Sequence, residues 1–180
     1  MTIFVTSDQH WFHKNIIKYC DRPFQSVEQM NYEMIKRWNF VVKPYDTVIH
    51  LGDFALVGHN YNKLKWLRYQ LHGKIRLMRG NHDKSPLRQF KSARISIIPC
   101  NTYTYKNLIF SHRPLDIVPE KFVNVHGHIH EKKSYGRRIN VSVDVSNFKP
   151  QRLSMVLWKA RLYSLLKNDI SKMNNYQFVV

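Results

Sequence analysis

The strongest constraint on the fold of this chain is a series of short, apolar, β-type runs, each of which ends abruptly in polar residues. The first run is Thr2–Thr6, the second is Thr47–Leu51 and the third is Lys74–Met78. Runs of this length that stop at a turn predict buried strands. The first half of the chain therefore contains at least three strands, and each leads directly into a loop.

Helical patterns separate these strands. From Val27 onwards, apolar residues recur at the spacing of an amphipathic helix, with Ser26 as a plausible N-cap and an end before Pro44. Residues Tyr61–Leu71 are also helix-like, and Gly73 follows them as glycines often follow helices. The tryptophan and tyrosines of this second helix stand at helical spacing. We interpret them as core residues rather than as a surface that stacks on bases.

The second half of the chain is richer in strands. The candidate runs are Ile95–Ile98, Thr102–Tyr105, Leu108–Phe110, Phe122–Val125 and Ile139–Val143. Lys106 and Asn107 predict a tight turn, and Arg152–Leu166 returns to a helical pattern. Alternating strands and helices followed mainly by strands indicate an α/β body with two sheets. At 180 residues, we expect a single domain over residues 1–180.

The charge of the chain favours anionic partners. Twenty-nine lysines and arginines against 12 acidic residues give a formal net charge of +17, spread over both halves of the sequence. A positive field of this size favours nucleotides or nucleic acid, and an ordinary solvated surface is the alternative. Two cysteines are too few for a disulfide framework. With no secretory leader and no long apolar run, we expect a cytoplasmic protein that is not bound to a membrane.

Five polar clusters follow the predicted strands. They are Asp8 with His10, Gly52 with Asp53, Gly80 to Asp83, Ser111 with His112, and Gly127 to His130. Loops beyond the carboxyl ends of the strands in an α/β sheet meet at one edge, so clusters distant in sequence can form one site. On an extended segment, Asp8 and His10 point to the same side and can share a cation, and the same alternation applies to His128 and His130.

Seven side chains in these clusters are candidate metal ligands. They are Asp8, His10, Asp53, Asn81, His112, His128 and His130. Nitrogen and oxygen donors without a thiolate suit manganese, iron, cobalt, nickel or zinc. Seven donors are more than one ion needs, so they divide naturally between two ions that share one carboxylate.

The five clusters, in this order from Asp8 to His130, resemble the motif blocks of the calcineurin-like metallophosphoesterase superfamily. The segment from His10 to Ile16, followed by Arg22 to Phe24, is similar to that of small bacterial and phage members. The resemblance implies an α/β fold, a four-layer αββα sandwich of two mixed β-sheets, with a dinuclear metal centre at one end. The loops between the motifs are short, which indicates an open cleft without a cap domain.

The resemblance also implies a role for each ligand. Asp8, His10 and His130 would hold the first ion, Asn81, His112 and His128 the second, and Asp53 would bridge them. Manganese is the expected metal, with iron, nickel, cobalt or zinc as alternatives. Two such ions would generate a bridging hydroxide as the nucleophile. His82 would protonate the leaving oxygen or stabilise charge on the phosphoryl group. From its adjacency in the sequence, and not from the resemblance, Asp83 is expected to orient the ring of His82.

Two further residues, His13 and Arg22, are candidate contacts to the substrate, although surface packing would explain them equally well. The basic segment 132–138 either grips a phosphate backbone or is a solvated turn. No role is expected for His50, His59, His72 and His126.

The resulting hypothesis is a metal-dependent enzyme that hydrolyses phosphodiesters of nucleotides or nucleic acid, with phosphomonoesters as a second class of substrate. The alternatives are a nucleic-acid-binding module that keeps the fold without turnover and a structural metal domain with closed coordination.

Overall fold

The first sheet has five strands, most of them parallel, and its centre comes from the first half of the chain. The computed structural model describes residues 1–58 and 60–163. The strands of this sheet are β1 (Ile3–Thr6), β2 (Thr47–His50), β3 (Lys74–Leu77), β4 (Ile95–Ile97) and β9 (Gln151–Arg152). Their order is β4-β3-β2-β1-β9, and only β9 runs antiparallel to its neighbour. The carboxyl ends of β1, β2 and β3 therefore meet at one edge.

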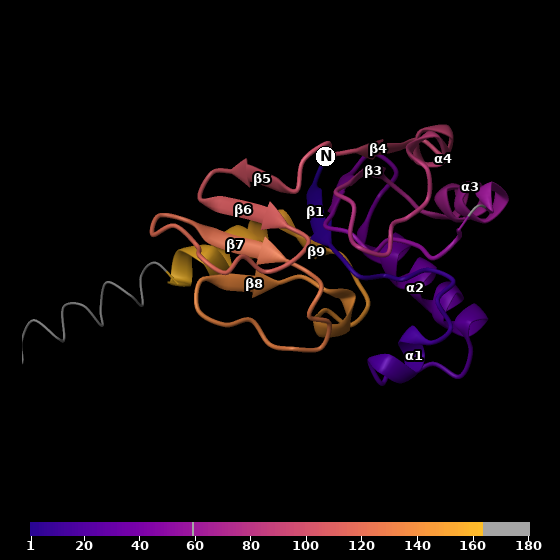
Figure 1. Ribbon diagram of the computed structural model, residues 1–180, viewed down its shortest axis with the longest axis horizontal. Coiled ribbons are helices and arrows are strands. Elements are labelled where there is room, and N and C mark those ends of the chain that lie inside the picture. Colours follow the sequence, from indigo (N-terminus) through magenta and orange to yellow (C-terminus); the bar gives the residue numbers. More distant parts are fainter. Residues whose placement is uncertain (59, 164–180) are drawn as a thin grey trace, which may run out of the picture.

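The second sheet contains β5 (Thr102–Tyr105), β6 (Leu108–Ser111), β7 (Val123–His126) and β8 (Arg138–Asn140), in that order. The first two form an antiparallel hairpin around the predicted turn, and the remaining pairs are parallel. Two mixed sheets with flanking helices confirm the predicted fold class (Figure 1).

The long helices are those whose periodicity is visible in the sequence. α2 (Val27–Val41) begins at Ser26, whose side chain accepts a hydrogen bond from Gln29 N, and α3 (Tyr61–Gln70) follows Asn60. Residues 153–163 are helical, and the rest of the predicted helix to Leu166 lies outside the described residues. No described helix has the length and apolar character needed to cross a bilayer.

Three short elements were not predicted from the sequence. They are α1 (Ile16–Tyr19), α4 (Leu87–Ser92) and β9, and a 3-10 turn (Val143–Val145) follows β8. Segments of two to six residues are too short to show a helical or strand period, so tertiary contacts decide their conformation.

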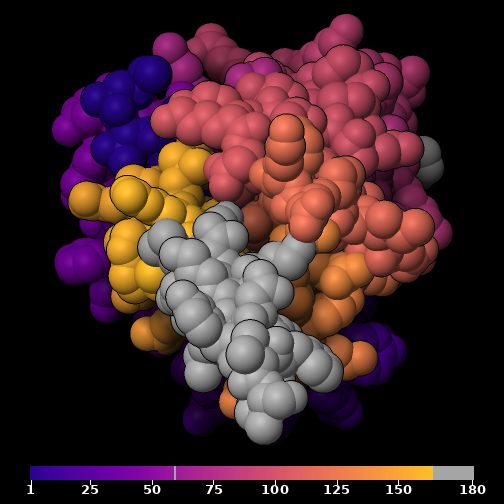
Figure 2. Space-filling model, turned by 90° about the vertical axis from the view of Figure 1, so that its left-hand side faces the viewer, coloured from indigo at the N-terminus to yellow at the C-terminus, as the bar shows by residue number. Residues whose placement is uncertain are grey.

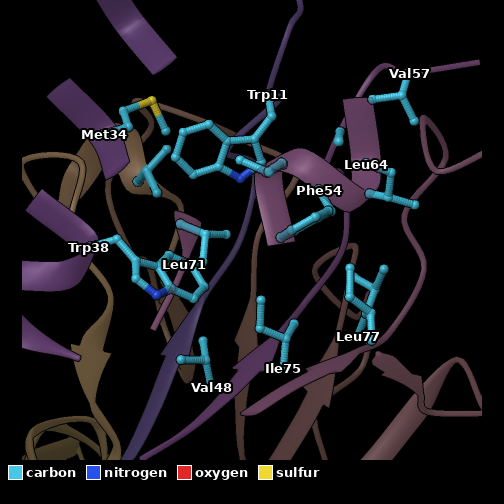
Figure 3. Packing of buried hydrophobic residues seen from close by; sticks show 14 of the residues in the cluster. Trp11, Met34, Trp38, Val48, Phe54, Val57, Leu64, Leu71, Ile75 and Leu77 are labelled. Carbon is cyan, nitrogen blue, oxygen red and sulfur yellow. The ribbon is translucent and has the colours of Figure 1, made fainter. Parts of the chain in front are cut away.

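Strand alternation divides the apolar side chains between two cores. In β1, Phe4 packs with the helices on one face of the first sheet, whereas Val5 packs with the second sheet on the other. The first core includes Trp11 and Trp38 (Figure 3). The second core also takes Val156 from the C-terminal helical segment, which lies beside the second sheet in Figure 2.

The aromatic residues of α3 correct one of our interpretations. The core face of this helix is formed by Leu64 and Leu67, which are fully buried. Trp66 is 51% exposed and Tyr69 is 89% exposed, so neither is a core residue. The two leucines stand three positions apart and cover the sheet, and the aromatic residues between and beyond them turn outwards.

Candidate metal centre

The loops that carry the polar clusters are joined directly to one another. Asp8 N donates to Gly52 O at 3.0 Å and His10 N donates to Asp53 O at 3.0 Å, which ties the loop after β1 to the loop after β2. A parallel bridge between Ser7 and Ser142 links the ends of β1 and β8, and with them the two sheets. The predicted convergence of these loops is therefore present.

The backbone of this site is unusual. Five candidate ligands adopt left-handed conformations, with φ of 62° at Asp8, 52° at His10, 55° at Asp53, 70° at His128 and 49° at His130. Such conformations cost non-glycine residues on the order of 1–3 kcal/mol each and cluster at functional sites. These segments are not extended where the candidate ligands stand, so strand alternation is not the reason why Asp8 and His10 lie in one group, although they do so as expected.

Glycines let the loops approach closely enough to touch. A Cβ on Gly127 would lie 2.2 Å from Ser7 Oγ and 2.5 Å from Asp8 Oδ2. Gly52 has φ of +100°, and a Cβ there would lie 2.6 Å from His112 Nδ1. These contacts leave no space for a larger residue, so the glycines of the polar clusters position the candidate ligands.

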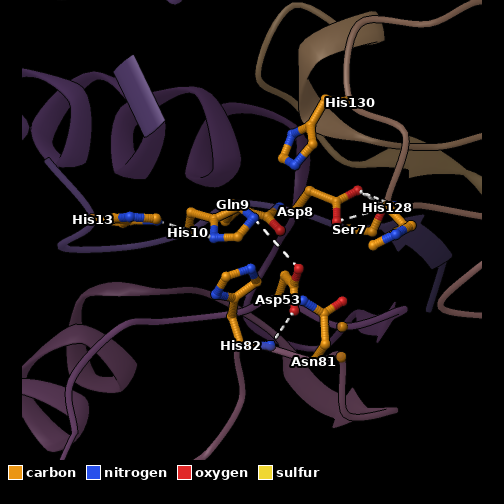
Figure 4. A network of polar contacts seen from close by, with 12 residues as sticks. Ser7, Asp8, Gln9, His10, His13, Asp53, Asn81, His82, His128 and His130 are labelled. Carbon is orange, nitrogen blue, oxygen red and sulfur yellow. Dashed lines mark hydrogen bonds and ion pairs between the residues drawn. The ribbon is translucent and has the colours of Figure 1, made fainter. Parts of the chain in front are cut away.

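The candidate ligands fall into two groups (Figure 4). Asp8, His10 and His130 form one, and Asp53, His112 and His128 form the other; each holds its three ligand atoms within 4.8 Å of one another. His128 and His130 thus belong to different groups, contrary to the shared orientation expected from alternation. Both histidines have left-handed backbones, so strand alternation does not set the directions of their side chains.

Asp53 stands between the two groups. Its Oδ2 lies 3.5 Å from His10 Nε2 and 3.4 Å from His112 Nε2. Asn81 Oδ1 lies 2.9 Å from the same nitrogen of His112, so the amide joins the second group. One carboxylate therefore faces imidazoles from both groups, which is the position of a bridging ligand.

The protonation of these groups suits cation binding. His10 Nε2 is buried without a hydrogen-bond partner, a costly arrangement unless another species satisfies it. Burial lowers the pKa of His10 to about 2 and that of His128 to about 4, which keeps both rings neutral. Burial alone would raise the pKa of Asp53, but its contact with His112 dominates and holds it below the ordinary value. Neutral rings at His10 and His128 beside an ionised Asp53 fit a divalent cation. Burial alone would lower the pKa of His112, but its contact with Asp53 raises it, so a cation bound there would displace a proton.

Two imidazoles are oriented by hydrogen bonds on their other nitrogen. His112 Nδ1 lies 2.8 Å from Leu51 O, and His130 Nδ1 lies 2.9 Å from Asp144 Oδ2. A carbonyl or carboxylate oxygen only accepts, so each Nδ1 carries the proton and each Nε2 of the neutral ring offers a lone pair. Although burial lowers the pKa of His130, the bond to Asp144 raises it to about 10 overall. A cation at Nε2 would therefore displace a proton.

Asp144 was missed by the sequence analysis. The only available signal was its position directly after the predicted strand Ile139–Val143, the same signal that marked the other clusters. Its carboxylate accepts hydrogen bonds from Ser142 Oγ at 3.0 Å and from Arg22 as well as from His130. It is thus the centre of a buried network that orients a candidate ligand.

Arg22 corrects the expectation of a substrate contact. Its side chain is 0% exposed, with Nε 2.8 Å and Nη2 3.0 Å from the two carboxylate oxygens of Asp144. The guanidinium also donates to Asp8 O at 2.7 Å and to Gln9 O at 2.9 Å. A fully buried cation whose donors are occupied by protein atoms cannot reach a substrate. Arg22 instead fixes the loop that carries Asp8.

His82 and His13 lie at the rim of the site. The exposed His82 is held through its backbone, whose N–H donates to Asp53 Oδ1 at 2.8 Å, and its ring centroid is 5.1 Å from that of His10. His13 Nδ1 lies 3.4 Å from His10 Nδ1, and burial lowers its pKa. Asp83 does not orient His82: its carboxylate accepts from the backbone N–H groups of Asp53, Phe54 and Gly80.

The basic segment 132–138 is only partly available to a ligand. Arg137 donates to the carbonyls of Glu120 and Val118, and Arg138 donates to those of Leu115 and Asp116. These two arginines therefore hold the loop 115–120 in place. Lys132 and Lys133 remain exposed. Of the basic residues in this segment, these two are therefore the ones that could contact a phosphate backbone.

Three of the histidines without an expected role make hydrogen-bond contacts inside the fold. His50 Nε2 contacts Gln9 Oε1, and Gly52 N donates to His50 Nδ1 at 3.1 Å, so this buried ring links two loops. His126 Nδ1 contacts the carbonyl of Gly127, and His72 Nδ1 contacts that of Val42. His59 lies outside the described residues.

Comparisons with known proteins place this site in a family. An uncharacterised protein of Methanocaldococcus jannaschii is 37% identical over 165 residues, covering 86% of this chain and 89% of that protein. The crystal structure of a protein of unknown function from Aquifex aeolicus has a similar fold, with a TM-score of 0.68, 23% identity and coverage of 86% of this chain and 97% of that one. The sequence matches the calcineurin-like phosphoesterases over residues 1–175, and the chain therefore belongs to this family of metal-dependent phosphoester hydrolases.

Proposed function

We propose that this protein hydrolyses phosphodiesters of nucleotides or nucleic acid at a dinuclear metal centre, and that residues 1–180 form one catalytic domain. The observation that carries the proposal is the position of Asp53 Oδ2, between His10 Nε2 at 3.5 Å and His112 Nε2 at 3.4 Å. A single buried carboxylate placed between two groups of nitrogen and oxygen donors suits a pair of cations.

The two ions would be held by the two groups of side chains. Asp8, His10 and His130 would bind one, Asn81, His112 and His128 would bind the other, and Asp53 would bind both. Manganese is the expected metal, with iron, nickel, cobalt or zinc as alternatives. When bound, two such ions lower the pKa of a water molecule and stabilise negative charge on a phosphoryl group.

His82 is the proposed general acid. Its ring is exposed beside His10, while its backbone is fixed by the bond from its N–H to Asp53 Oδ1. An imidazole with its ring free and its backbone anchored can donate a proton to the leaving oxygen. His13, which contacts His10 from the other side, remains a proposed substrate contact.

The surroundings of the site support an anionic substrate. A cleft of about 380 Å³ adjoins the second group and is lined by Asn81, His112 and the exposed Arg113. The net charge of +17 adds a field that attracts polyanions. Nucleotides and nucleic acid carry this kind of charge, and nucleic acid as a polyanion gains most from such a field, which is why we prefer them as substrates.

The test compares a chromogenic bis-aryl phosphodiester with the matching monoester, with manganese and after chelation. We expect the diester to be the better substrate and chelation to abolish turnover. Asp53→Asn should abolish activity and prevent full occupancy of the two metal sites. His82→Ala should lower kcat by roughly 10²- to 10⁴-fold while the metal content is retained.

Asp116→Asn is a matched control, because Asp116 is exposed and belongs to neither group of ligands. Turnover that survives chelation, or an Asp53→Asn variant as active as Asp116→Asn, would refute the proposal. Binding of nucleic acid without any turnover would instead favour the alternative, a binding module that keeps the fold.

A further inference from the structure

A groove between α2 and α3 presents aromatic side chains to solvent outside the candidate metal centre. It has a volume of about 570 Å³, within the range of ligand sites, and its lining includes Phe12, Tyr32, Lys36, Lys63 and Trp66. Tyr32 is 66% exposed and Trp66 is 51% exposed. Figure 1 shows these two helices on the side of the first sheet that faces away from the second sheet.

The aromatic rings and lysines of the groove are interleaved. The ring centroids of Phe12 and Trp66 lie 6.1 Å apart with an interplanar angle of 56°, and Lys63 Nζ lies 5.7 Å from the centroid of Phe12. The same three residues line a second hollow of about 450 Å³, together with Asn60 and Asn62. The surface therefore offers ring faces, cations and side-chain amides within one continuous patch.

The groove begins at the edge of the metal centre. Phe12 is two residues from His10, so their Cα atoms are within about 7 Å. Phe12 is held there by a left-handed backbone with φ of 66° and by a hydrogen bond from its N–H to Asn31 Oδ1 at 3.2 Å. A nucleic-acid strand that passes His10 at the metal centre therefore reaches the aromatic groove within one or two nucleotides.

Exposed aromatic faces beside cations are the elements that bind single-stranded nucleic acid, in which unpaired bases stack on rings while lysines contact phosphates. The charged residues of the lining are Lys36 and Lys63 against Glu28, on a protein whose net charge is +17. We propose that this groove binds unpaired bases of a single-stranded nucleic acid whose phosphodiester lies at the metal centre, an inference that rests on the proposed function for the identity of that phosphodiester.

Binding is best measured on the full chain in chelator, so that no hydrolysis occurs. The probes are fluorescein-labelled single strands of DNA and RNA of one sequence, and the corresponding DNA duplex. We expect Trp66→Ala to raise the Kd for a single strand about 5- to 100-fold, the effect of losing one stacked base. Trp66→Phe should retain most of the affinity, because it keeps a ring face. The duplex should show no dependence on Trp66.

Trp158→Ala is the matched control, since Trp158 is 56% exposed but belongs to the C-terminal helical segment, away from the groove. Thermal unfolding of each variant checks that the fold is kept. A Kd that is equal in Trp66→Ala and Trp158→Ala for both single strands would overturn the inference, as would an equal effect of Trp66→Ala on the duplex.

The two proposals fail in different ways. If the wild-type protein hydrolyses the aryl diester but Trp66 has no effect on strand binding, the groove assignment is wrong and the enzyme assignment stands. If strand binding depends on Trp66 but no ester is hydrolysed, the groove assignment stands and the proposed activity is wrong. A Trp66→Ala enzyme that loses activity on oligonucleotides more than on the aryl diester supports both.

Discussion

The buried ion pair between Arg22 and Asp144 can be tested by removing each charge separately. In Asp144→Asn, the carboxylate that accepts from Arg22 and orients His130 becomes a neutral amide. In Arg22→Met, the carboxylate loses its buried cation but keeps the imidazole. If Arg22 positions the loop after β1, both changes should destabilise the fold. If Arg22 contacts substrate, Arg22→Met should affect mainly KM.

The structure sets the size of the expected effect. The Arg22 side chain is completely buried, and two of its nitrogens lie 2.8 and 3.0 Å from the carboxylate oxygens of Asp144. Removing one member of such a pair leaves an uncompensated buried charge and costs about 3–5 kcal/mol in the free energy of unfolding. Loss of the bond that orients His130 should also weaken binding of the ion at that ligand about 10- to 100-fold.

The assay is urea unfolding of the metal-free protein for the wild type, both single variants and the Arg22→Met, Asp144→Asn double variant. Manganese titration calorimetry of the same four proteins reports the effect on the metal centre. Because the double variant removes both charges together, we expect it to lose less stability than the sum of the two single changes. Single variants that each lose less than about 1 kcal/mol, or strictly additive losses, would refute the assignment.

Three further predictions concern other parts of the fold. Burial alone would raise the pKa of Asp144, but its bond to His130 and the charge of Arg22 lower it from 3.8 to about 2. The free energy of unfolding should therefore fall by about 2 kcal/mol as the pH drops from above 3.8 to below 2, which urea unfolding measures. Gly127→Ala places a methyl group 2.2 Å from Ser7 Oγ and should weaken manganese binding in calorimetry. Trp38→Ala empties a site in the first core and should cost about 3–5 kcal/mol in unfolding free energy.

Each of these predictions has a control. In Asp144→Asn, the free energy of unfolding should fall less steeply at acidic pH than in the wild type. An unchanged pH dependence would contradict the assignment of this loss to the carboxyl of Asp144. Gly136→Ala introduces the same methyl where the nearest atom is 3.6 Å away. Its φ of +53° will cost some stability, but without a contact to the ligand loops it should not alter manganese affinity. Trp158→Ala, at an exposed position, should change stability far less than Trp38→Ala; equal losses would contradict the core assignment.

Much of the fold could be predicted because its long elements carry local signals. The apolar spacing and the Ser26 cap identified α2, and the short β-type runs before Asp8 and Asp53 identified β1 and β2. α3 shows the limit of such signals. Its helical character was correctly predicted, but the exposure of Trp66 was not, because periodicity shows that a helix has an apolar face without showing which residues the sheet covers.

For the candidate site, the sequence supplied the list of donors, and their roles as metal ligands remain predictions. Their identities follow from side-chain chemistry and from their positions after strands, which are local properties. How they are grouped is not local: the backbone N–H of His128 donates to both carboxylate oxygens of Asp8, 120 residues away in the chain. The separation of His128 and His130 into two groups was expected only from the family resemblance, because no signal within the segment 127–130 distinguishes them.

The sequence by itself determined which segments form the long strands and helices, and which polar residues stand at their ends, since both depend on neighbours along the chain. Only the tertiary structure decided that Arg22 is buried against Asp144 and that Trp66 faces solvent. The position of Asp53 between two groups of imidazoles was expected from the family resemblance and not from local sequence signals. These features arise from packing between distant segments, where shape and burial rather than local composition select the partners of each side chain.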